Sequence, residues 1–257
     1  MTEPAAGSLG RVLVVMPTYN ELPNIEPVLA RLRAAVPQAD VLVVDDNSPD
    51  GTGEVAERLG ERDPAVHVLH RPAKQGLGAA YVAGFRWGLD RGYDVLVEMD
   101  ADGSHLPEQL PSLLAALEHA DLVLGSRWVK GGSVTDWPLS RLALSRGGNA
   151  YVRLSLGLGL RDATGGFRAF RRDLLEQINL DTVSSQGYCF QVDLARRAVR
   201  EGATVVEVPI TFVERVYGSS KMSGWIVREA LWRVTQWSAV LRWQQVRALT
   251  GAHRRGR

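Results

Sequence analysis

The sequence of 257 residues contains one cysteine, Cys189, which excludes an intramolecular disulfide and a metal site built from cysteines. No segment approaches the roughly 18 consecutive apolar residues that a membrane-spanning helix needs. The first ten residues show no basic segment followed by an apolar one, so we expect no signal peptide. Together these absences favour the cytosolic side of a cell.

The net charge is also small, at +1, but the charged residues are unevenly distributed along the chain. Residues 214–257 carry a net charge of +7, and residues 1–213 carry −6. A basic C-terminal segment suits an anionic partner, such as phosphates, lipid headgroups or nucleic acid. For residues 253–257 we prefer the interpretation of a solvated tail.

The composition, 45% hydrophobic and 23% charged, is ordinary for a globular protein long enough for one large α/β domain. Short apolar runs predict strands at residues 12–16, 41–45, 66–70, 95–99 and 122–125. Between them, helical patterns occur at residues 22–36, 53–59, 77–91 and 107–119. This alternation predicts a Rossmann-like, doubly wound, mostly parallel sheet, whose ligands bind beyond the carboxyl ends of its strands.

The second half is less regular. A basic, glycine-punctuated stretch covers residues 127–172, a helix is predicted near 190–200, and strands are predicted near 204–212. A long, tryptophan-rich helix is predicted at 222–247. There is no internal repeat, low-complexity segment or linker, so we expect one domain with a C-terminal appendage.

Two polar clusters follow the first two predicted strands. Pro-Thr-Tyr-Asn-Glu stands at residues 17–21, where tyrosine and glutamate can hold a flat base or a ribose; a plain turn with a helix cap is the alternative. Asp-Asp-Asn-Ser-Pro-Asp stands at residues 45–50, where an α/β sheet often holds a nucleoside. Its residues also form turns, but its carboxyl and amide groups exceed what a turn needs.

The most informative cluster follows the fourth predicted strand, where Asp100 and Asp102 are separated by one residue. Two such carboxylates repel each other unless a cation lies between them. Hard oxygen ligands on Mg²⁺ or Mn²⁺, bridging to a substrate diphosphate, remove that repulsion. The alternative is a pair of solvated acids in a turn.

In this order, the three clusters resemble those of the family-2 inverting glycosyltransferases of GT-A fold, which use nucleotide-diphosphate sugars. Later motifs narrow the resemblance to the polyprenol- and dolichol-phosphate mannosyltransferases; they lie at residues 125–132, 137–138, 145–149, 162–168 and 212–221. The resemblance covers residues 11–225 and is to the short form of the family, without transmembrane tails. One departure is Ser104, where some members carry glutamine beside the metal.

The resemblance implies transfer of mannose, with inversion, from GDP-mannose to a polyprenyl (dolichol-type) monophosphate. It places the donor at Pro17, Tyr19, Glu21, Val44, Asp46, Asp100, Ala101, Asp102, Arg215 and Lys221. The Mg²⁺ or Mn²⁺ ion would be held by Asp100, Asp102 and Ser104. The acceptor phosphate would be bound by Arg127, Arg141 and Ser145, and the catalytic residues would be Asp102, Arg127 and Arg215.

The chemistry of the residues agrees with this reading. A phosphate monoester has a second pKa of about 6, so it is mostly a dianion near neutrality and needs no general base. The site needs cations to bind that acceptor, and a metal with arginine or lysine to stabilise the departing diphosphate. The five histidines have the pattern of ordinary strand, turn or surface residues, and only His105 lies near the acidic motif.

The domain organisation follows from these motifs. We expect a flexible N-terminus at 1–10, a GT-A catalytic domain at 11–221 and an amphipathic helix with a basic tail at 222–257. On a helical wheel the last segment has an apolar arc that includes Leu231, Val234 and Trp237, while Trp225, Trp232 and Trp243 lie opposite.

The tryptophan stripe predicts a peripheral protein on the cytoplasmic face of a membrane. The alternative is that these tryptophans cover a second groove or a partner subunit. The leucine- and glycine-rich stretch 154–160 is a second candidate for lipid contact. The expected partners are therefore the two substrates, a membrane surface and a membrane-anchoring protein, and no nucleic acid.

Other readings remain open. UDP-glucose is an alternative donor. A sugar-phosphate nucleotidyltransferase would need a glycine-rich phosphate loop after the first strand, where residues 17–20 stand instead. A dinucleotide-dependent oxidoreductase is disfavoured because Tyr81 occupies the third glycine position of the candidate motif. The last alternative is a non-catalytic lipid-binding subunit, against which the intact Asp100 and Asp102 argue.

Overall fold

The computed structural model describes residues 9–183, 188–215 and 224–254, and within these ranges it contains a large seven-stranded sheet. The strands are β1 Val12–Thr18, β2 Asp40–Asp45, β3 Val66–His70, β4 Val95–Glu98, β5 Leu122–Ser126, β7 Arg168–Arg171 and β8 Val205–Pro209. A small second sheet pairs β6 Ser133–Val134 with β9 Thr211–Phe212. The five strands predicted in the first half are all present, with small changes at their ends.

The large sheet has the strand order β3-β2-β1-β4-β7-β5-β8. All neighbouring strands in this sheet are parallel except at β7, which lies antiparallel between β4 and β5. The order reverses direction at β1, because the chain runs outward from β1 to β3 and then returns to β4 on the other side. This confirms the predicted doubly wound, mostly parallel α/β fold, whose ligand site is expected at such a reversal.

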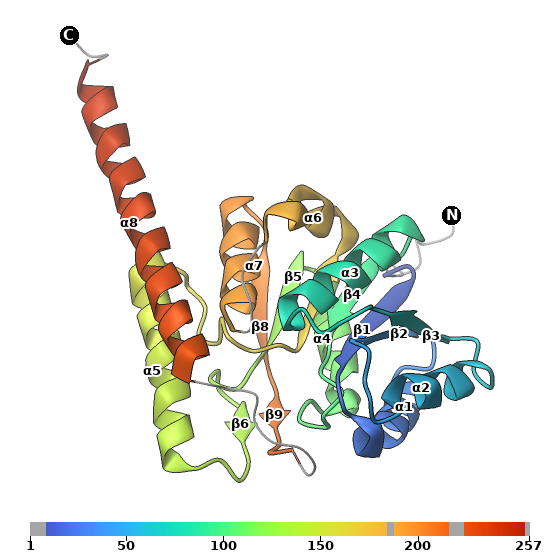
Figure 1. The fold of residues 1–257 in the computed structure, drawn as a ribbon. Helices are drawn as coiled ribbons and strands as arrows, with labels where there is room; N and C mark the ends of the chain where they lie inside the picture. The colour runs from blue at the N-terminus through green and yellow to red at the C-terminus, as the bar shows by residue number, and fades with distance from the viewer. Residues whose placement is uncertain (1–8, 184–187, 216–223, 255–257) are drawn as a thin grey trace, which may run out of the picture.

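Helices cover both faces of the large sheet (Figure 1). The α-helices are α1 Leu22–Ala35, α2 Thr52–Gly60, α3 Leu77–Asp90, α4 Leu110–Leu117, α5 Leu139–Leu156, α6 Arg172–Gln177, α7 Tyr188–Arg200 and α8 Gly224–Arg254, with short 3₁₀ turns at Pro107–Gln109 and Leu180–Thr182. Helices α1, α2 and α4 build one apolar core with the sheet. Helices α3, α5, α6 and α7 contribute to the core on the other face. Burial on both faces explains why the central strands read as continuous apolar runs.

Three elements of the stretch 127–172, namely β6, α5 and β7, were not predicted individually. Strand β7 is only four residues long and carries a buried Arg168, so it lacks the apolar signature of a central strand. Helix α5 contains the adjacent Gly147 and Gly148, each of which costs about 1 kcal/mol in a helix relative to alanine. Packing against α8 compensates, and one contact there is a hydrogen bond of 2.7 Å between the hydroxyls of Tyr151 and Thr235.

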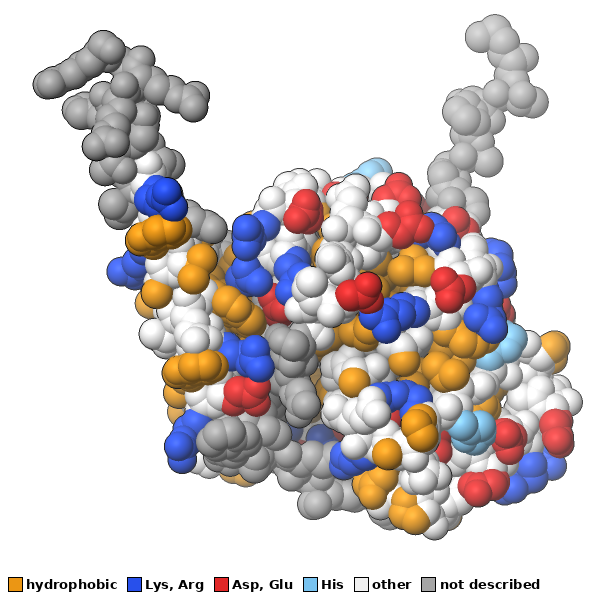
Figure 2. Space-filling view, turned by 45° about the horizontal axis from the view of Figure 1, so that its top comes forward, with side chains coloured by type: hydrophobic (Ala, Val, Ile, Leu, Met, Phe, Trp, Pro, Cys, Tyr) orange, Lys and Arg blue, Asp and Glu red, His pale blue; other side chains and the backbone are white. Residues whose placement is uncertain are grey.

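Helix α8 extends beyond the body of the molecule and alternates hydrophobic with basic side chains along its exposed length (Figures 1 and 2). Trp232 and Trp243 are 60% and 59% exposed, which confirms their predicted outward position. Val234 is buried and Trp237 packs against the core, as the apolar arc predicts. The side chain of Trp225 lies outside the described residues.

Two predictions about apolar contacts need correction, one in full and one in part. Leu231, assigned to the packed arc of α8, is 44% exposed. In the stretch 154–160, Leu154 is 77% exposed, but Leu156, the last residue of α5, and Leu158 and Leu160, in the segment that follows it, are buried. Of the four leucines, only Leu154 is therefore available for lipid contact, and the other three belong to the core. Among the described residues, no helix is both long and apolar enough to cross a membrane.

Candidate active site

The carboxyl ends of β1, β2 and β4 lie side by side, because these strands are parallel neighbours in the order β2-β1-β4. The register places Thr18 opposite Asp45 and Val15 opposite Glu98. The three polar clusters, at residues 17–21, 45–50 and 100–102 of the chain, therefore meet at one edge of the sheet. The parallel topology alone brings them together.

The two acids at the end of β2 have different partners. Asp45 accepts hydrogen bonds from the Thr18 hydroxyl at 3.0 Å and from the Ser48 N–H and hydroxyl at 3.0 and 2.5 Å. Asp46 instead forms an ion pair with Arg71. Burial raises the pKa of Asp46, and the charge of Arg71 opposes that rise. Asp45 thus holds the turn, and Asp46 remains the predicted donor-binding carboxylate.

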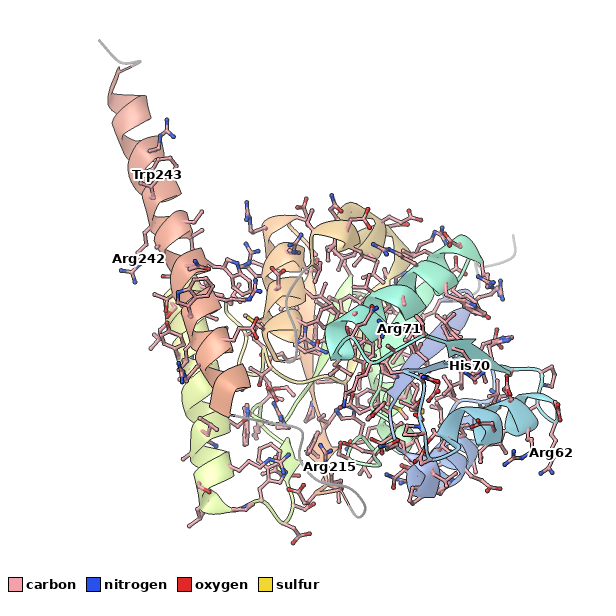
Figure 3. The ribbon with its side chains drawn as sticks, in the orientation of Figure 1. Arg62, His70, Arg71, Arg215, Arg242 and Trp243 are labelled. Carbon is pink, nitrogen blue, oxygen red and sulfur yellow. The ribbon has the colours of Figure 1, made fainter. Side chains whose placement is uncertain are left out.

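The segment after β3 contributes cations that the sequence analysis did not identify. Arg71, labelled in Figure 3 between β3 and α3, also donates to the Gln75 side chain at 2.9 Å. The Lys74 ammonium lies 4.0 Å from the centre of the Tyr19 ring. A signal was available, because both residues directly follow a strand of the same parallel sheet and must lie near the same edge.

The remaining predicted donor residues lie at this edge with different exposures. Pro17 is partly buried at the end of β1, and Glu21 is buried, where it accepts a hydrogen bond of 2.9 Å from the Asn24 side chain. Val44 and Ala101 are buried in the apolar core. Since their side chains face the core, these two residues can meet a ligand only through their backbone.

Asp100 is held by two residues of the surrounding core. The Tyr81 hydroxyl donates to its carboxylate at 2.9 Å, and its own N–H donates to His105 Nδ1 at 3.0 Å. The His105 ring is buried and stacks on Phe167 with centroids 5.1 Å apart. Because Nδ1 accepts this hydrogen bond and burial lowers the pKa of His105, the ring acts as a neutral support for the turn.

Asp102 is buried and bound by cationic and hydroxyl donors. Arg215 lies 3.0 Å from one carboxylate oxygen, and the Ser104 N–H and hydroxyl donate to the other at 3.0 and 2.5 Å. Burial alone would raise the pKa of Asp102, but Arg215 and Ser104 outweigh it and leave the pKa below its ordinary value. In contrast, burial raises the pKa of Asp100.

This donor set fits a divalent cation that shares its ligands with a substrate. Mg²⁺ and Mn²⁺ are commonly held by one or two carboxylates together with phosphate oxygens, and Asp100 and Asp102 provide those carboxylates. Among the described residues there is no group of three or more acid, histidine or cysteine side chains that would hold an ion without substrate. The Ser104 hydroxyl is bonded to Asp102, so here it orients that carboxylate.

Arg127, predicted to bind the acceptor phosphate, is buried and held by the chain itself. Its Nε and Nη2 donate to both oxygens of the buried Asp162 at 2.7 Å, and Nη2 also donates to the Thr164 hydroxyl at 3.1 Å. Asn149 of α5 donates to the same hydroxyl at 2.9 Å. Burial would raise the pKa of Asp162, but Arg127 outweighs it and holds the pKa below its ordinary value. Its role as phosphate ligand stays a prediction, and the ion pair fixes its position.

Arg141, the second predicted acceptor residue, lies on α5 with its guanidinium 4.0 Å from the centre of the Trp137 ring. It forms an ion pair with Glu214, the residue immediately before Arg215. Consecutive residues after β9 therefore contact both the predicted acceptor side and the acidic motif. Ser145, one turn further along α5, is partly exposed. Lys221, the last predicted donor residue, lies outside the described residues.

A buried polar layer beneath the acidic motif was also not predicted. Glu98 on β4 and Arg168 on β7 stand opposite each other in the strand register, and both are fully buried. Burial raises the pKa of Glu98 to about 8 and lowers that of Arg168 to about 10. Arg168 donates to three backbone carbonyls, one of them that of Gln191. This layer fixes the end of β4, from which Asp100 and Asp102 project.

Comparison with known proteins agrees with this geometry. The family model for glycosyl transferase family 2 matches residues 13–178. The chain is 60% identical over 241 residues to an undecaprenyl-phosphate mannosyltransferase of Micrococcus luteus, covering 94% of this chain and 99% of the relative. It is 58% identical over 229 residues to a polyprenol monophosphomannose synthase of Mycolicibacterium smegmatis, covering 88% and 86% of the two chains.

Solved structures of lower identity share the fold. Glucosyl-3-phosphoglycerate synthase of Mycobacterium tuberculosis, solved with uridine diphosphate, superposes with a TM-score of 0.66 at 21% identity, over 90% of this chain and 80% of that chain. A mannosyltransferase of Pyrobaculum calidifontis, solved with GDP-mannose and Mn²⁺, gives a TM-score of 0.56 at 21% identity, over 85% of this chain and 60% of that chain. With the family match and the two close relatives, these findings show that the chain belongs to glycosyl transferase family 2, in the group of the polyprenol monophosphomannose synthases.

Proposed function

We propose that this chain transfers mannose, with inversion, from GDP-mannose to a polyprenyl (dolichol-type) monophosphate, giving polyprenyl-phosphate mannose and GDP. The observation that carries the proposal is the arrangement of residues 214 and 215. Arg215 is paired with Asp102 at the acidic motif, while Glu214 is paired with Arg141 on α5. One short segment thus contacts both the predicted diphosphate site and the predicted acceptor side, an arrangement that supports transfer between two phosphate-bearing substrates.

The residues of the chain have separate tasks in this reaction. Tyr19, Glu21 and Asp46 bind the nucleoside, and Arg71 orients Asp46 through their ion pair. Arg127 and Arg141 hold the acceptor phosphate with one of its oxygens toward the anomeric carbon. That oxygen forms the new bond to carbon as the bond to the GDP oxygen breaks and its electron pair leaves with GDP. Attack from the opposite side inverts the anomeric centre.

Two positive groups would meet the charge that develops on GDP. Mg²⁺ or Mn²⁺ held by Asp100 and Asp102 would supply Lewis-acid stabilisation of the diphosphate. Arg215, which already lies 3.0 Å from Asp102, is placed to contact the same diphosphate. The acceptor needs no general base, because a phosphate monoester is mostly a dianion near neutral pH.

The direct test uses purified protein, Mg²⁺, polyprenyl phosphate and GDP-mannose labelled in the sugar. Label in a lipid extract that is labile to mild acid, and absent when a chelator removes the metal, is the expected result. Analysis of the anomeric configuration of the product tests the inversion. No transfer from GDP-mannose, with transfer from UDP-glucose under the same conditions, would overturn the donor and keep the reaction type.

We further propose that the enzyme acts as a peripheral protein on the cytoplasmic leaflet, where its lipid substrate lies. The exposed Trp232 and Trp243, together with Arg242 beside Trp243, give α8 the composition of an interfacial helix (Figure 3). Flotation with anionic liposomes tests this, and a protein that remains entirely in the soluble fraction would contradict it. If flotation requires a co-expressed membrane protein, the predicted membrane-anchoring partner gains support.

A further inference from the structure

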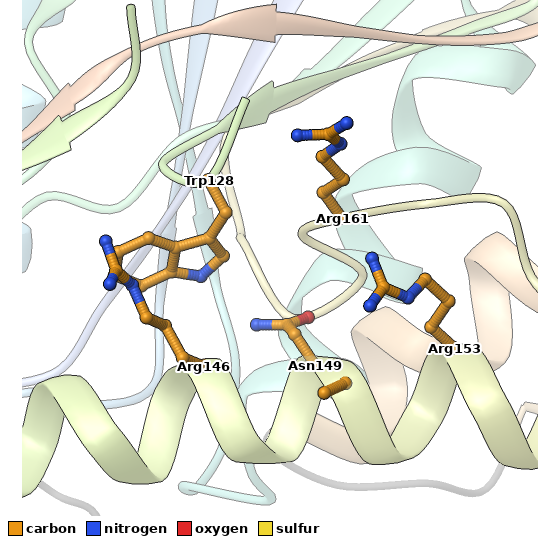
Figure 4. Close-up of a pocket in the computed structure, with 6 residues that line it drawn as sticks. Trp128, Arg146, Asn149, Arg153 and Arg161 are labelled. Atoms are coloured by element: carbon orange, nitrogen blue, oxygen red, sulfur yellow. The ribbon is translucent and has the colours of Figure 1, made fainter. Parts of the chain in front are cut away.

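Outside the predicted substrate residues, a cavity of about 230 Å³ lies between α5 and the segment that precedes β7 (Figure 4). Its lining includes Trp128, Asn149 and the arginines Arg146, Arg153 and Arg161. The volume is several times the ~30 Å³ that one water molecule occupies in the liquid, so a phosphate group fits. Figure 4 shows the three arginine side chains arranged around this space.

The charge of the cavity is unbalanced. No carboxylate of the described residues lies within ion-pair distance of the guanidinium groups of Arg146, Arg153 or Arg161. Other arginines nearby are used differently: Arg127 is paired with Asp162, and Arg168 donates to three carbonyls. All three side chains are exposed, and together they keep a positive potential around one concave space, which attracts an anion.

The wall of the cavity also presents a hydrogen-bond donor. Trp128 Nε1 is buried and has no hydrogen-bond partner, although a buried indole N–H is normally paired. The Arg146 guanidinium lies 5.0 Å from the centre of the same indole ring, so the cation and the indole lie side by side in the cavity wall. An anion with several oxygen acceptors would satisfy the indole N–H and the guanidinium groups at the same time.

The cavity is connected to the predicted acceptor site and remains separate from it. Asn149 lines the cavity and donates to Thr164, which in turn accepts from Arg127. The guanidinium carbons of Arg127 and Arg146 both lie within 5.6 Å of the Trp128 ring centre. A phosphate in the cavity would therefore lie next to the arginine that is predicted to receive the acceptor phosphate.

We propose that this cavity is a second phosphate site, which binds the phosphate monoester of a lipid. That lipid binds there either before it enters the transfer site or beside a lipid already bound in that site. The same helix exposes Leu144 and Leu154, at 46% and 77%, along which an acyl or prenyl chain can lie. The source of the phosphate is either the polyprenyl phosphate acceptor, in which case the inference deepens the proposed function, or a phospholipid of the bilayer. The phospholipid meant here is one that ends in a phosphate monoester, as phosphatidic acid does, because only such a lipid presents the same dianionic group as polyprenyl phosphate.

The test compares two triple variants with equal loss of charge. The first is Arg146→Gln/Arg153→Gln/Arg161→Gln, and the matched control is Arg58→Gln/Arg62→Gln/Arg200→Gln, whose arginines are exposed on other elements. Binding is measured by flotation with phosphatidylcholine vesicles that contain phosphatidic acid, a phosphate monoester, or phosphatidylglycerol, a diester. Circular dichroism and thermal unfolding verify that both variants are folded.

We expect the cavity variant to bind phosphatidic acid vesicles about tenfold more weakly, a loss of about 1.4 kcal/mol, because it removes the charged donors to the phosphate. The control should lose much less, and the loss with phosphatidylglycerol should be smaller than with phosphatidic acid. Equal losses in the cavity and control variants would overturn the proposal. Flotation requires no catalysis, so this result is independent of whether mannose is transferred.

Steady-state kinetics with a short-chain prenyl phosphate, in the absence of vesicles, distinguishes the sources. If the acceptor uses the cavity, the variant raises KM for that acceptor about tenfold and leaves kcat nearly unchanged. An unchanged KM with reduced flotation assigns the cavity to a bilayer phosphate. Trp128→Phe keeps an aromatic ring and removes the N–H, so it should change vesicle binding and KM in the same direction by a smaller factor. A Trp128→Phe variant that matches the unmodified protein in both assays would contradict the role of the indole.

Discussion

The predicted donor edge of the sheet, where β1, β2 and β4 end, and the outer side of α5 differ in how their charges are paired. At the donor edge, Asp46 and Asp102 are both bound by arginines of the same chain. On the outer side of α5, Arg146 and Arg153 have no acidic partner among the described residues. The first region is arranged around its own ion pairs, which ligands must join or displace. The second offers charge that is available to an external anion.

The largest expected effect concerns the acidic motif. Asp102→Asn removes the charge that pairs with Arg215 while it keeps an oxygen for the Ser104 donors. We expect mannosyl transfer to fall by about 10²–10³-fold, the usual cost of losing one electrostatic group in a transition state. The measurement is the transfer assay at saturating metal.

Asp136→Asn is the control for that variant, because Asp136 is exposed and its positive φ of 59° suits asparagine as well as aspartate. Full transfer activity in Asp102→Asn would refute the assignment of Asp102 to the metal and the diphosphate. It would also remove the argument against the alternative of a non-catalytic lipid-binding subunit.

A second prediction concerns the buried ion pair that holds Arg127. Asp162→Asn leaves the Arg127 guanidinium buried without its counter-charge, so we expect a loss of about 3–5 kcal/mol in the free energy of unfolding. Urea unfolding at neutral pH measures it. The matched control is Asp63→Asn, which breaks the more exposed Asp63–Arg33 pair and should cost no more than about 1 kcal/mol.

The same pair predicts a pH dependence. The folded pKa of Asp162 lies below its ordinary value of 3.8, so its contribution is fully present above pH 3.8 and is lost as the pH falls through the folded value. The stability difference between the unmodified protein and Asp162→Asn should therefore shrink below pH 3.8. A constant difference across that range would show that the cost of the substitution is not electrostatic.

Membrane association is expected to respond more moderately. Trp232→Ala and Trp243→Ala each remove an exposed aromatic ring from α8, and each should weaken vesicle partition about tenfold if the ring inserts, because burying a large apolar side chain contributes roughly 1.5–3 kcal/mol. Flotation with anionic vesicles measures the change. Gln236→Ala, at an exposed position of the same helix, should have little effect. An unchanged partition in both tryptophan variants would favour a partner subunit as the contact of this face.

The smallest effect is expected at the surface. Arg31 and Glu108 form a bidentate pair with both distances at 2.8 Å, but both side chains are exposed. Glu108→Gln should cost about 0.2–1 kcal/mol, far less than the loss at Asp162. Urea unfolding under the same conditions gives the comparison, and a cost comparable to that of Asp162→Asn would mean that burial does not explain the difference between the two pairs.

The sequence predicted the first half well because local patterns coincide with tertiary structure there. Apolar runs marked the five strands, and polar clusters directly after β1, β2 and β4 marked one edge of the sheet. It predicted less of the second half, since β7 is short and charged and α5 is interrupted by glycines. Both elements form because of what they pack against, and a single sequence does not display those partners.

The sequence by itself determined the fold class, the family and the set of polar residues that follow the parallel strands. Only the tertiary structure decided which of those residues pair with each other: Asp46 with Arg71, Asp102 with Arg215, Arg127 with Asp162 and Arg141 with Glu214. It also left Arg146, Arg153 and Arg161 around one cavity. The physical reason is that hydrophobic periodicity is a local property of the chain, whereas charge pairing depends on residues brought together from distant segments.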